Sequence, residues 1–270
     1  MGISRHRACR VLALALASLL LSWAAPARAL VLDWDGVTWT PGSLNNSFNL
    51  NGDGFNDITV DITSQNQGVF TNDPTTGTIT PAISQTMTGG LLAAQNSLVI
   101  AANLHTNSNL TVHLSFTGGT SGNVPGANNV SFSLFDIDVT TNADIISNIY
   151  GVAPDGTHIA ATISNLGSAV TLGGSGLTQT LTGNAASAND SSDGNATISF
   201  GSTLITDLYF TFGNTAGAPR YQDIGIGDIT FTPVPEINPA ISASVSSFIA
   251  VGLTVFMQRR AKRRRALIRQ

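Results

Sequence analysis

The first candidate for chemistry is an oxygen-rich loop with the sequence NLNGDGFND. Its candidate ligands alternate along the chain and comprise Asn49, Asn51, Asp53, the carbonyl group of Phe55, and Asp57. This spacing matches the first nine positions of an EF-hand-type loop, which binds Ca²⁺ through oxygen atoms and turns at a glycine, here Gly54. The glutamate of the twelfth position is absent, because Val60 stands there. We therefore predict a short extracellular-type Ca²⁺ loop, with a metal-free Asn/Gly/Asp turn as the alternative.

A second group of carboxylates lies in the segment FDIDVTTNAD. Asp136 and Asp138 are two apart on an expected strand, which would place both on one face about 7 Å apart. Asp144 follows after a turn. A glycosidase acid/base pair is one interpretation, but laminarinase-type enzymes carry Glu-x-Asp-x-x-Glu, and both glutamates are missing here. A weaker second calcium site, or a capped strand end, is the preferred interpretation.

The histidines and tryptophans give no recognisable site in the sequence. His113 and His158 alternate with apolar strand residues, so we expect them on solvent faces, and no His-x-His metal spacing is present. Trp34 and Trp39 would suit a platform on which sugars stack. The preferred interpretation places both tryptophans in the core, where large aromatic side chains usually lie.

Short alternating strands must position these residues. Apolar and polar side chains alternate strictly over residues 57–63, and the same period recurs over residues 98–104 and 110–116. A further strand is expected over residues 158–163, and no stretch of the body has a sustained helical period. The expected fold is therefore all-β, a two-sheet sandwich with the jelly roll as its preferred form.

Two of the expected strands depart from simple alternation. In the segment that begins at Val130, the apolar parity changes after Leu134, so that Phe135, Ile137 and Val139 point to the other side. This strand is expected to be buried on both faces or bulged. A similar change between residues 224 and 231 predicts a β-bulge near Gly227 and Asp228.

The charge of the body excludes several partners. Residues 30–232 contain fifteen aspartates, no glutamate, no lysine and one arginine, Arg220, which gives a net charge of −14. Such a field repels nucleic acid, anionic lipid and anionic polysaccharide unless divalent cations bridge them. We therefore expect no nucleic-acid partner, and we expect Arg220 to pair with an aspartate.

The N-terminus has the pattern of a signal peptide over residues 1–29. Three arginines precede an apolar run over residues 11–25, and Ala27 and Ala29 supply the small side chains that a signal peptidase requires. Cleavage is expected after Ala29. The only cysteine, Cys9, would leave with this segment, so no disulfide is expected in the mature chain.

The C-terminal segment, residues 233–270, has three parts in order. A motif at residues 234–239 precedes an apolar run at residues 240–257 and a basic tail at residues 259–270. As a helix, the 18 apolar residues would reach about 27 Å, close to the roughly 30 Å hydrocarbon core of a membrane. The basic tail should remain in the cytoplasm, which places the body, residues 30–232, outside it.

This order of parts resembles the PEP-CTERM sorting signal of Gram-negative bacteria. Val234, Pro235 and Glu236 match its usual Val-Pro-Glu-Pro core, and Ile237 replaces the second proline. The resemblance implies an exosortase-type processing protease as partner, a membrane-anchored stage, and a final place at the cell surface or in the extracellular matrix. An ordinary C-terminal membrane anchor is the alternative. Within the body, QDIGIGDITF and the segment from VSFSLFDIDV onward resemble sandwich ectodomains that accompany such signals.

Two function classes follow from these observations. The preferred one is a non-catalytic exported surface or exopolysaccharide-matrix protein that binds glycan weakly with the help of Ca²⁺. The alternative is a secreted glycan-active hydrolase on a jelly roll. The first is favoured because the body contains no glutamate, whereas glycoside hydrolysis generally uses a pair of suitably spaced acidic residues.

Overall fold

The computed structural model describes residues 28–65, 69–91, 95–117 and 126–234. The chain divides into two units, Met1–Val234 and Pro235–Gln270, and the second lies outside the described residues. The predicted apolar run at residues 240–257, the basic tail and the signal peptide before Arg28 therefore also lie outside them. No helix among the described residues is long and apolar enough to cross a membrane.

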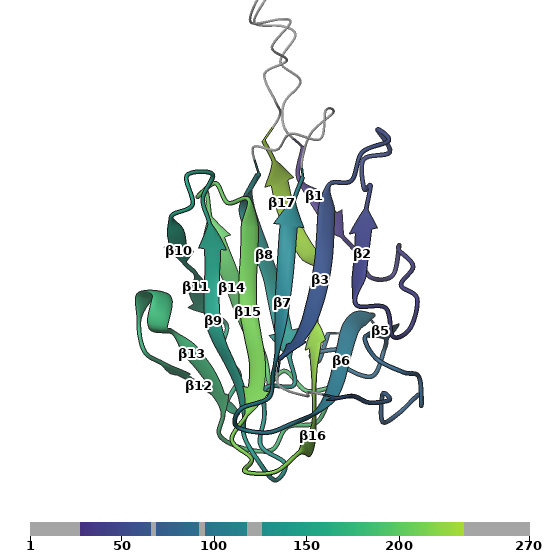
Figure 1. The fold of residues 1–270 in the computed structure, drawn as a ribbon, viewed down its shortest axis with the longest axis vertical. Coiled ribbons are helices and arrows are strands. Elements are labelled where there is room, and N and C mark those ends of the chain that lie inside the picture. The colour runs from purple at the N-terminus through teal and green to yellow at the C-terminus, as the bar shows by residue number, and fades with distance from the viewer. Residues whose placement is uncertain (1–27, 66–68, 92–94, 118–125, 235–270) are drawn as a thin grey trace, which may run out of the picture. The chain divides into compact units, whose positions relative to one another are not determined.

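Two antiparallel sheets form the described body (Figure 1). Sheet A has nine strands, and its main path runs through β1 (Leu30–Leu32), β17 (Ile229–Pro233), β8 (Ala127–Phe135), β16 (Arg220–Ile226), β6 (Ser97–Leu104) and β4 (Val69–Phe70). Three further strands join this sheet: β14 (Ala196–Gly201) pairs with β8, β11 (Thr162–Ser164) with β14, and β5 (Ala82–Ser84) with β6.

Sheet B has eight strands. Its main path runs through β12 (Val170–Gly173), β13 (Thr180–Gly183), β9 (Asp144–Val152), β15 (Asp207–Asn214), β7 (Asn109–Phe116), β3 (Ile58–Gln65) and β2 (Asn45–Phe48). The short strand β10 (His158–Ala160) pairs with β9, and a single 3₁₀ turn, η1 (Gly176–Thr178), precedes β13. The prediction of an all-β two-sheet sandwich is confirmed.

One apolar core lies between the two sheets and explains the alternating pattern. In β3 the side chains of Ile58, Val60 and Ile62 are buried, as the alternation over residues 57–63 predicts. Trp34 and Trp39 join the same core, and their ring centroids are 6.3 Å apart. The core interpretation of the tryptophans is confirmed, and the sugar-platform interpretation is wrong for both.

The two irregular strands behave as their parity predicts. Phe135 leaves the main core and packs with Met87 and Val99 in a separate apolar cluster, so the end of β8 is buried on both faces. Between the pairs Ile226↔Leu134 and Thr230↔Ser131 the chain advances four residues against three in β8. The extra residue is the irregularity expected near Gly227 and Asp228.

The single strand expected over residues 158–163 is wrong. The segment forms β10 in sheet B and β11 in sheet A, on either side of the buried Ala161. The apolar period is continuous because both halves face the same core, although the chain crosses from one sheet to the other between them.

The core predicts a clear contrast between two phenylalanine variants. Phe210 is fully buried between the sheets, whereas Phe55 is 43% exposed. Phe210→Ala is expected to lower the free energy of unfolding by about 3–5 kcal/mol, because it leaves a cavity that the sheets cannot close. Phe55→Ala should change it by no more than about 0.5 kcal/mol. Urea denaturation of both variants measures the difference, and equal losses would contradict this core.

Candidate functional site

Four aromatic side chains form a continuous row on the solvent face of sheet B. These residues, here named the aromatic row, are His113 on β7, Tyr209 on β15, Tyr150 on β9, and His158 on β10. Strand register brings them together, since Tyr209 is paired with His113 on one side and with Tyr150 on the other. The successive ring centroids are 4.3, 5.3 and 4.3 Å apart, with each pair of rings stacked.

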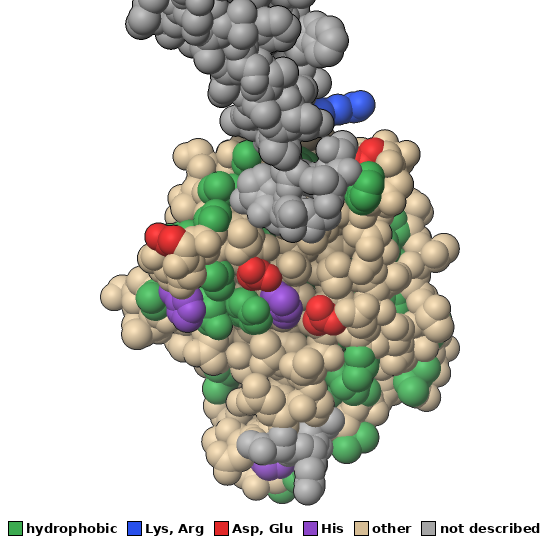
Figure 2. Space-filling view, turned by 45° about the horizontal axis from the view of Figure 1, so that its top comes forward, with side chains coloured by type: hydrophobic (Ala, Val, Ile, Leu, Met, Phe, Trp, Pro, Cys, Tyr) green, Lys and Arg blue, Asp and Glu red, His purple; other side chains and the backbone are tan. Residues whose placement is uncertain are grey.

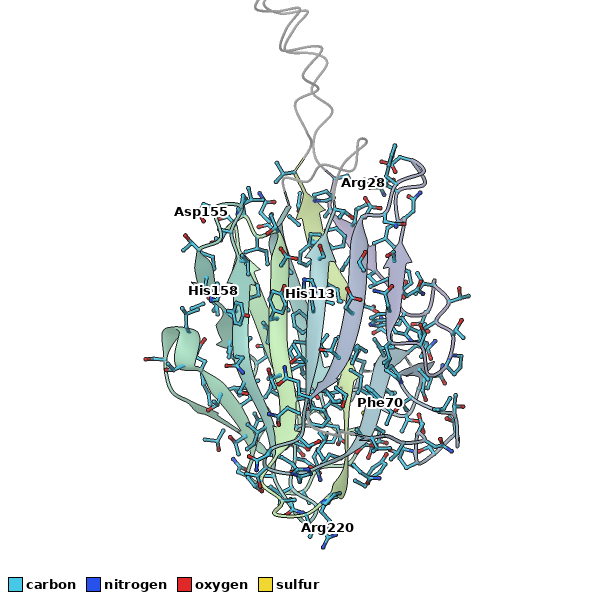
Figure 3. The ribbon with its side chains drawn as sticks, viewed as in Figure 1. Arg28, Phe70, His113, Asp155, His158 and Arg220 are labelled. Carbon is cyan, nitrogen blue, oxygen red and sulfur yellow. The ribbon has the colours of Figure 1, made fainter. Side chains whose placement is uncertain are left out.

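The row faces solvent because its strand neighbours face the core. Val112, Leu114, Leu208 and Phe210 are all fully buried, so the residues between them point outward. Figure 3 labels His113 and His158 at the two ends of the row. The solvent-face prediction for both histidines is confirmed.

Two carboxylates stand beside the His113 end of the row. His113 Nε2 donates to Asp207 Oδ1 at 2.7 Å, and this hydrogen bond holds the pKa of Asp207 below its ordinary value. On the other side, His113 Nδ1 is 3.8 Å from Asp61 Oδ2. Burial, with the nearby charge of Asp207, raises the pKa of Tyr209, so its hydroxyl stays protonated. Figure 2 shows this face. Histidine, acidic and hydrophobic side chains, a class that includes tyrosine in the figure, lie together there in one band.

A second feature is a cavity of about 170 Å³ near Arg220, at the end of the sandwich where β8 ends and β9 and β16 begin (Figure 3). It is here named the acidic pocket and is lined by Asp136, Asp138, Asp144 and Asp223, with Tyr221, Gln222, Ser187, Asn189, Thr140 and Pro74 around them. Three of the four aspartates come from one segment, and Asp223 comes from β16, far along the sequence.

The backbone around the pocket corrects one prediction. Asp136 and Asp138 do not share a strand face, because β8 ends at Phe135 and Asp136 takes a left-handed conformation with φ of 65°. The loop that follows is held by β13, where a Cβ on Gly183 would lie only 1.9 Å from the Asp138 carbonyl oxygen. Only a glycine permits this contact, which brings Asp138 against Asp144.

The hydrogen bonds of the pocket satisfy some of its oxygens and leave others without a donor. Asp138 Oδ2 accepts from Ser187 N at 2.9 Å, Asp144 Oδ2 from Asp138 N at 3.2 Å, and Asp223 Oδ2 from the Tyr221 hydroxyl at 2.9 Å. Three buried atoms of the lining have no hydrogen-bond partner, and all three are acceptors: Asp136 Oδ1, Asp144 Oδ1 and Gln222 Oε1.

Burial dominates the electrostatics of this pocket. It raises the pKa of Asp136 to about 8, with further contributions from the charges of Asp223 and Asp138. Burial likewise holds the pKa of Asp144 well above its ordinary value and raises that of Asp223 to about 6, although the Tyr221 hydrogen bond opposes the latter shift. The four carboxylates therefore cannot all be ionised near neutral pH without a compensating positive charge.

The predicted calcium loop closes through its own side chains. The carboxylate of Asp57 accepts from Leu50 N at 2.7 Å and from Asn51 N at 3.2 Å. The Asn51 amide donates to both Asp53 and Asp57 at 3.1 Å, and Asn49 Oδ1 accepts from Gly52 N at 2.8 Å. The metal-free turn accounts for all of these contacts, and calcium at this loop stays a prediction.

Neither the loop at residues 49–57 nor the acidic pocket has its side chains already arranged as a set of metal ligands. Among the described residues, no three His, Cys, Asp or Glu side chains are grouped so that they would hold a metal ion as they stand.

Of the processing residues, Ala29 and Val234 are described, and Val234 N donates to the Gly126 carbonyl at 3.0 Å. Ala27, Pro235 and Glu236 lie outside the described residues.

The expected ion pair of Arg220 with an aspartate is wrong. Its Nη1 donates to the carbonyl of the neighbouring Pro219 at 3.2 Å, and the ion pairs within the described ranges involve His113 instead. The side chain is exposed, so water solvates the guanidinium at no cost of burial.

No protein-family model matches the chain, and no curated protein matches its sequence. Among solved structures, the chain is similar to a family 11 carbohydrate-binding module from Clostridium thermocellum in complex with a β-1,3-1,4-mixed-linked tetrasaccharide, with 11% identity and a TM-score of 0.33 over 78% of this chain and 99% of that one. A mannan-recognising module, TmCBM27, gives 10% identity and a TM-score of 0.32 over 64% of this chain and 88% of that one. TM-scores of this size transfer no residue role and no ligand to the chain.

Sequence reasoning missed the two central residues of the aromatic row and the contribution of β16 to the acidic pocket. Tyr150 and Tyr209 both carry a signal, since each is an outward-facing aromatic residue in an alternating strand. Asp223 carries none, because only the fold brings it to Asp136 and Asp144.

The acidic pocket predicts an unusual dependence of stability on pH. Between the ordinary carboxyl pKa of 3.8 and the folded-state value of about 8 for Asp136, the folded chain binds more protons than the unfolded chain. Stability in the presence of a chelator should therefore fall as pH rises through this window, and should be greatest at its acidic end. Urea midpoints at about pH 5 and about pH 8 measure the fall.

Asp136→Asn is the matched control for this dependence. The amide has no proton to lose, so the variant should show a clearly smaller fall than the wild type over the same range. A wild-type midpoint that rises with pH, or an unchanged slope in Asp136→Asn, would contradict the raised pKa.

Proposed function

We propose that this chain is a non-catalytic exported protein whose β-sandwich binds an uncharged extracellular polysaccharide along the aromatic row. The observation that carries the proposal is the continuous stack of His113, Tyr209, Tyr150 and His158 across four neighbouring strands of an open sheet face. Four strands at the usual spacing give the row a length of roughly 14 Å, which suits a polymer segment better than a single small molecule.

A sugar has both apolar and polar surfaces, and the aromatic row offers groups that can contact each kind. A sugar ring presents apolar C–H groups on its faces and hydroxyl groups around its edge. Because the four rings stack face to face, the row presents their edges, together with the tyrosine hydroxyls, the imidazole nitrogens and the carboxylates of Asp61 and Asp207. Because the rings stack on one another, they are already ordered before binding, which lowers the entropy cost of forming a complex.

Charge selects among polysaccharides. Asp61 and Asp207 flank the row, and the body as a whole carries −14, so a polyanion would be repelled. The row lies on a sheet face and lines neither the cavity of about 280 Å³ nor that of about 170 Å³. We therefore expect modest affinity for a neutral chain, since tight ligand sites are generally clefts.

The hydrolase alternative is less well supported by the acidic pocket. A general acid must come within about 3 Å of the glycosidic oxygen that it protonates. The side chains of Asp136 and Asp144 are 6% and 2% exposed, so a sugar has little access to them. Their raised pKa values fit a buried cluster as well as they fit catalysis.

Export and sorting complete the proposal. The signal-peptide pattern before Ala29 and the PEP-CTERM-like motif at Val234 support export, a membrane-anchored stage and exosortase processing, with the cell surface or matrix of a Gram-negative bacterium as destination. The jelly-roll form is supported by the crossings between sheets at each step from β6 to β9. Calcium would support binding through the stability of the sandwich.

Substitutions in the row test glycan binding. Tyr150→Ala and Tyr209→Ala should each weaken binding to neutral polysaccharide about tenfold or more, because each removes a ring from the middle of the stack. Phe55→Ala, which removes an exposed ring elsewhere, should bind as the wild type does. A glycan array followed by calorimetry with the full chain measures this. Failure of the wild type to bind any neutral glycan, or release of reducing ends, would contradict the proposal.

Processing has its own test. Intact-mass analysis of the protein recovered from its native host should show loss of the first 29 residues and a new C-terminus near Pro235 and Glu236. The prolines of this motif favour an extended backbone that a protease cleft accepts as a strand. A mature species that keeps residues 240–270 would indicate an ordinary anchor instead.

A further inference from the structure

The acidic pocket combines buried acceptors with a lack of donors. Asp136 and Asp144 are 6% and 2% exposed, Gln222 is 5% exposed, and each carries an oxygen without a hydrogen-bond partner. All three oxygens line one cavity. An unsatisfied buried acceptor destabilises the fold, and a charged one does so most, so three in one place call for a positively charged occupant.

The chain itself supplies no such charge within the described residues. Their lysines and arginines are Arg28 and Arg220 alone, and Arg220, the closer of the two in sequence to the pocket, donates to Pro219. Protons that neutralise the carboxyl groups are one substitute. A cation from solution, which displaces those protons when it binds, is the other.

The size and chemistry of the pocket select the kind of cation. The unpartnered oxygens are buried, so a single ion that these oxygens enclose suits the pocket better than an amine or guanidinium group on a carbon chain. All candidate ligands are oxygen atoms of carboxylate, amide or hydroxyl groups, which hard cations prefer. Ca²⁺ accepts six to eight such ligands in irregular geometry, whereas Mg²⁺ demands a near-ideal octahedron.

We propose that the acidic pocket binds one Ca²⁺ ion through side chains of the two sheets and of the loop between β8 and β9, namely Asp136, Asp138, Asp144, Asp223 and Gln222. This site shares no residue with the aromatic row, and the proposal does not rest on the proposed glycan binding. Because the side chains are not already grouped for a metal ion, the oxygens must converge by side-chain rotation when the ion enters. Mutual repulsion keeps like charges from converging without it.

The ion joins a loop, a strand of sheet B and a strand of sheet A. Asp136 and Asp138 lie in the loop after β8, Asp144 opens β9 in sheet B, and Asp223 lies in β16 of sheet A. A cation bound to all of them ties the two sheets together at this end of the sandwich. Its expected role is therefore structural.

The experiment is thermal unfolding of the full chain, purified in detergent, in excess calcium and in a chelator. At free calcium about 100 times the dissociation constant, the wild-type midpoint should rise by roughly 5–10 °C. Asp144→Asn should lose this rise. In chelator, its midpoint should equal or exceed that of the wild type, because the amide needs neither a proton nor an ion to be neutral in the pocket.

Two control variants show whether the rise belongs to the acidic pocket or to carboxylates elsewhere in the body. Asp155→Asn, at an exposed turn, should keep the full rise, and Asp53→Ala, in the loop at residues 49–57, should keep the part of the rise that Asp144→Asn loses. If Asp144→Asn does not fold, Asp223→Asn supplies the same comparison. The proposal is overturned if calcium leaves the wild-type midpoint unchanged. It is equally overturned if the rise disappears in Asp53→Ala and survives in Asp144→Asn.

Discussion

The structure depends on how a body with fifteen aspartates and one arginine supplies donors to its carboxylates. Within the described residues the ion pairs are with His113 alone, so the other carboxylates rely on backbone N–H groups, hydroxyls and side-chain amides. Short turns provide these donors, since an aspartate side chain readily accepts from an amide two residues on. This arrangement recurs at Asp33, Asp53, Asp73 and Asp155. Aspartate suits it better than glutamate, whose longer side chain reaches past the local amide.

The same constraint explains why one end of the sandwich differs from the rest. A turn can satisfy one carboxylate from its own backbone, as Asp73 shows with Thr75 and Thr76. In the acidic pocket, carboxylates from separate segments meet at a strand end, and the amides of Ser187 and Asp138 satisfy only two oxygens. The local backbone offers too few donors where the tertiary structure brings together aspartates from separate segments. Burial with so few donors raises the pKa values of the aspartates in the pocket.

Sequence could predict what depends on neighbours along the chain. The alternation in β3, the two-sided burial at Phe135 and the irregularity near Gly227 are local patterns, and the structure has all three. The alternating pattern does not show where β8 ends. The chain turns at Asp136, which takes a positive φ, and an aspartate at this position marks a turn less clearly in the sequence than a glycine would. Nor does periodicity tell which sheet a strand joins, which is why residues 158–163 read as one strand. Pairing across the sheet decides both candidate sites, and one sequence carries no pairing information.

The two sites also differ in how calcium can affect them. One Ca²⁺ ion would change the body's charge from −14 to about −12, so the field that repels polyanions remains. The ion is badly placed to bridge the chain to a polysaccharide, because four of the five side chains that would hold it are no more than 6% exposed. Any calcium dependence of glycan binding must then act through the ordering of β9, which begins at Asp144 in the pocket and carries Tyr150 in the aromatic row. Calcium would therefore change the fraction of chains with an ordered row, while the preference for uncharged ligands stays the same.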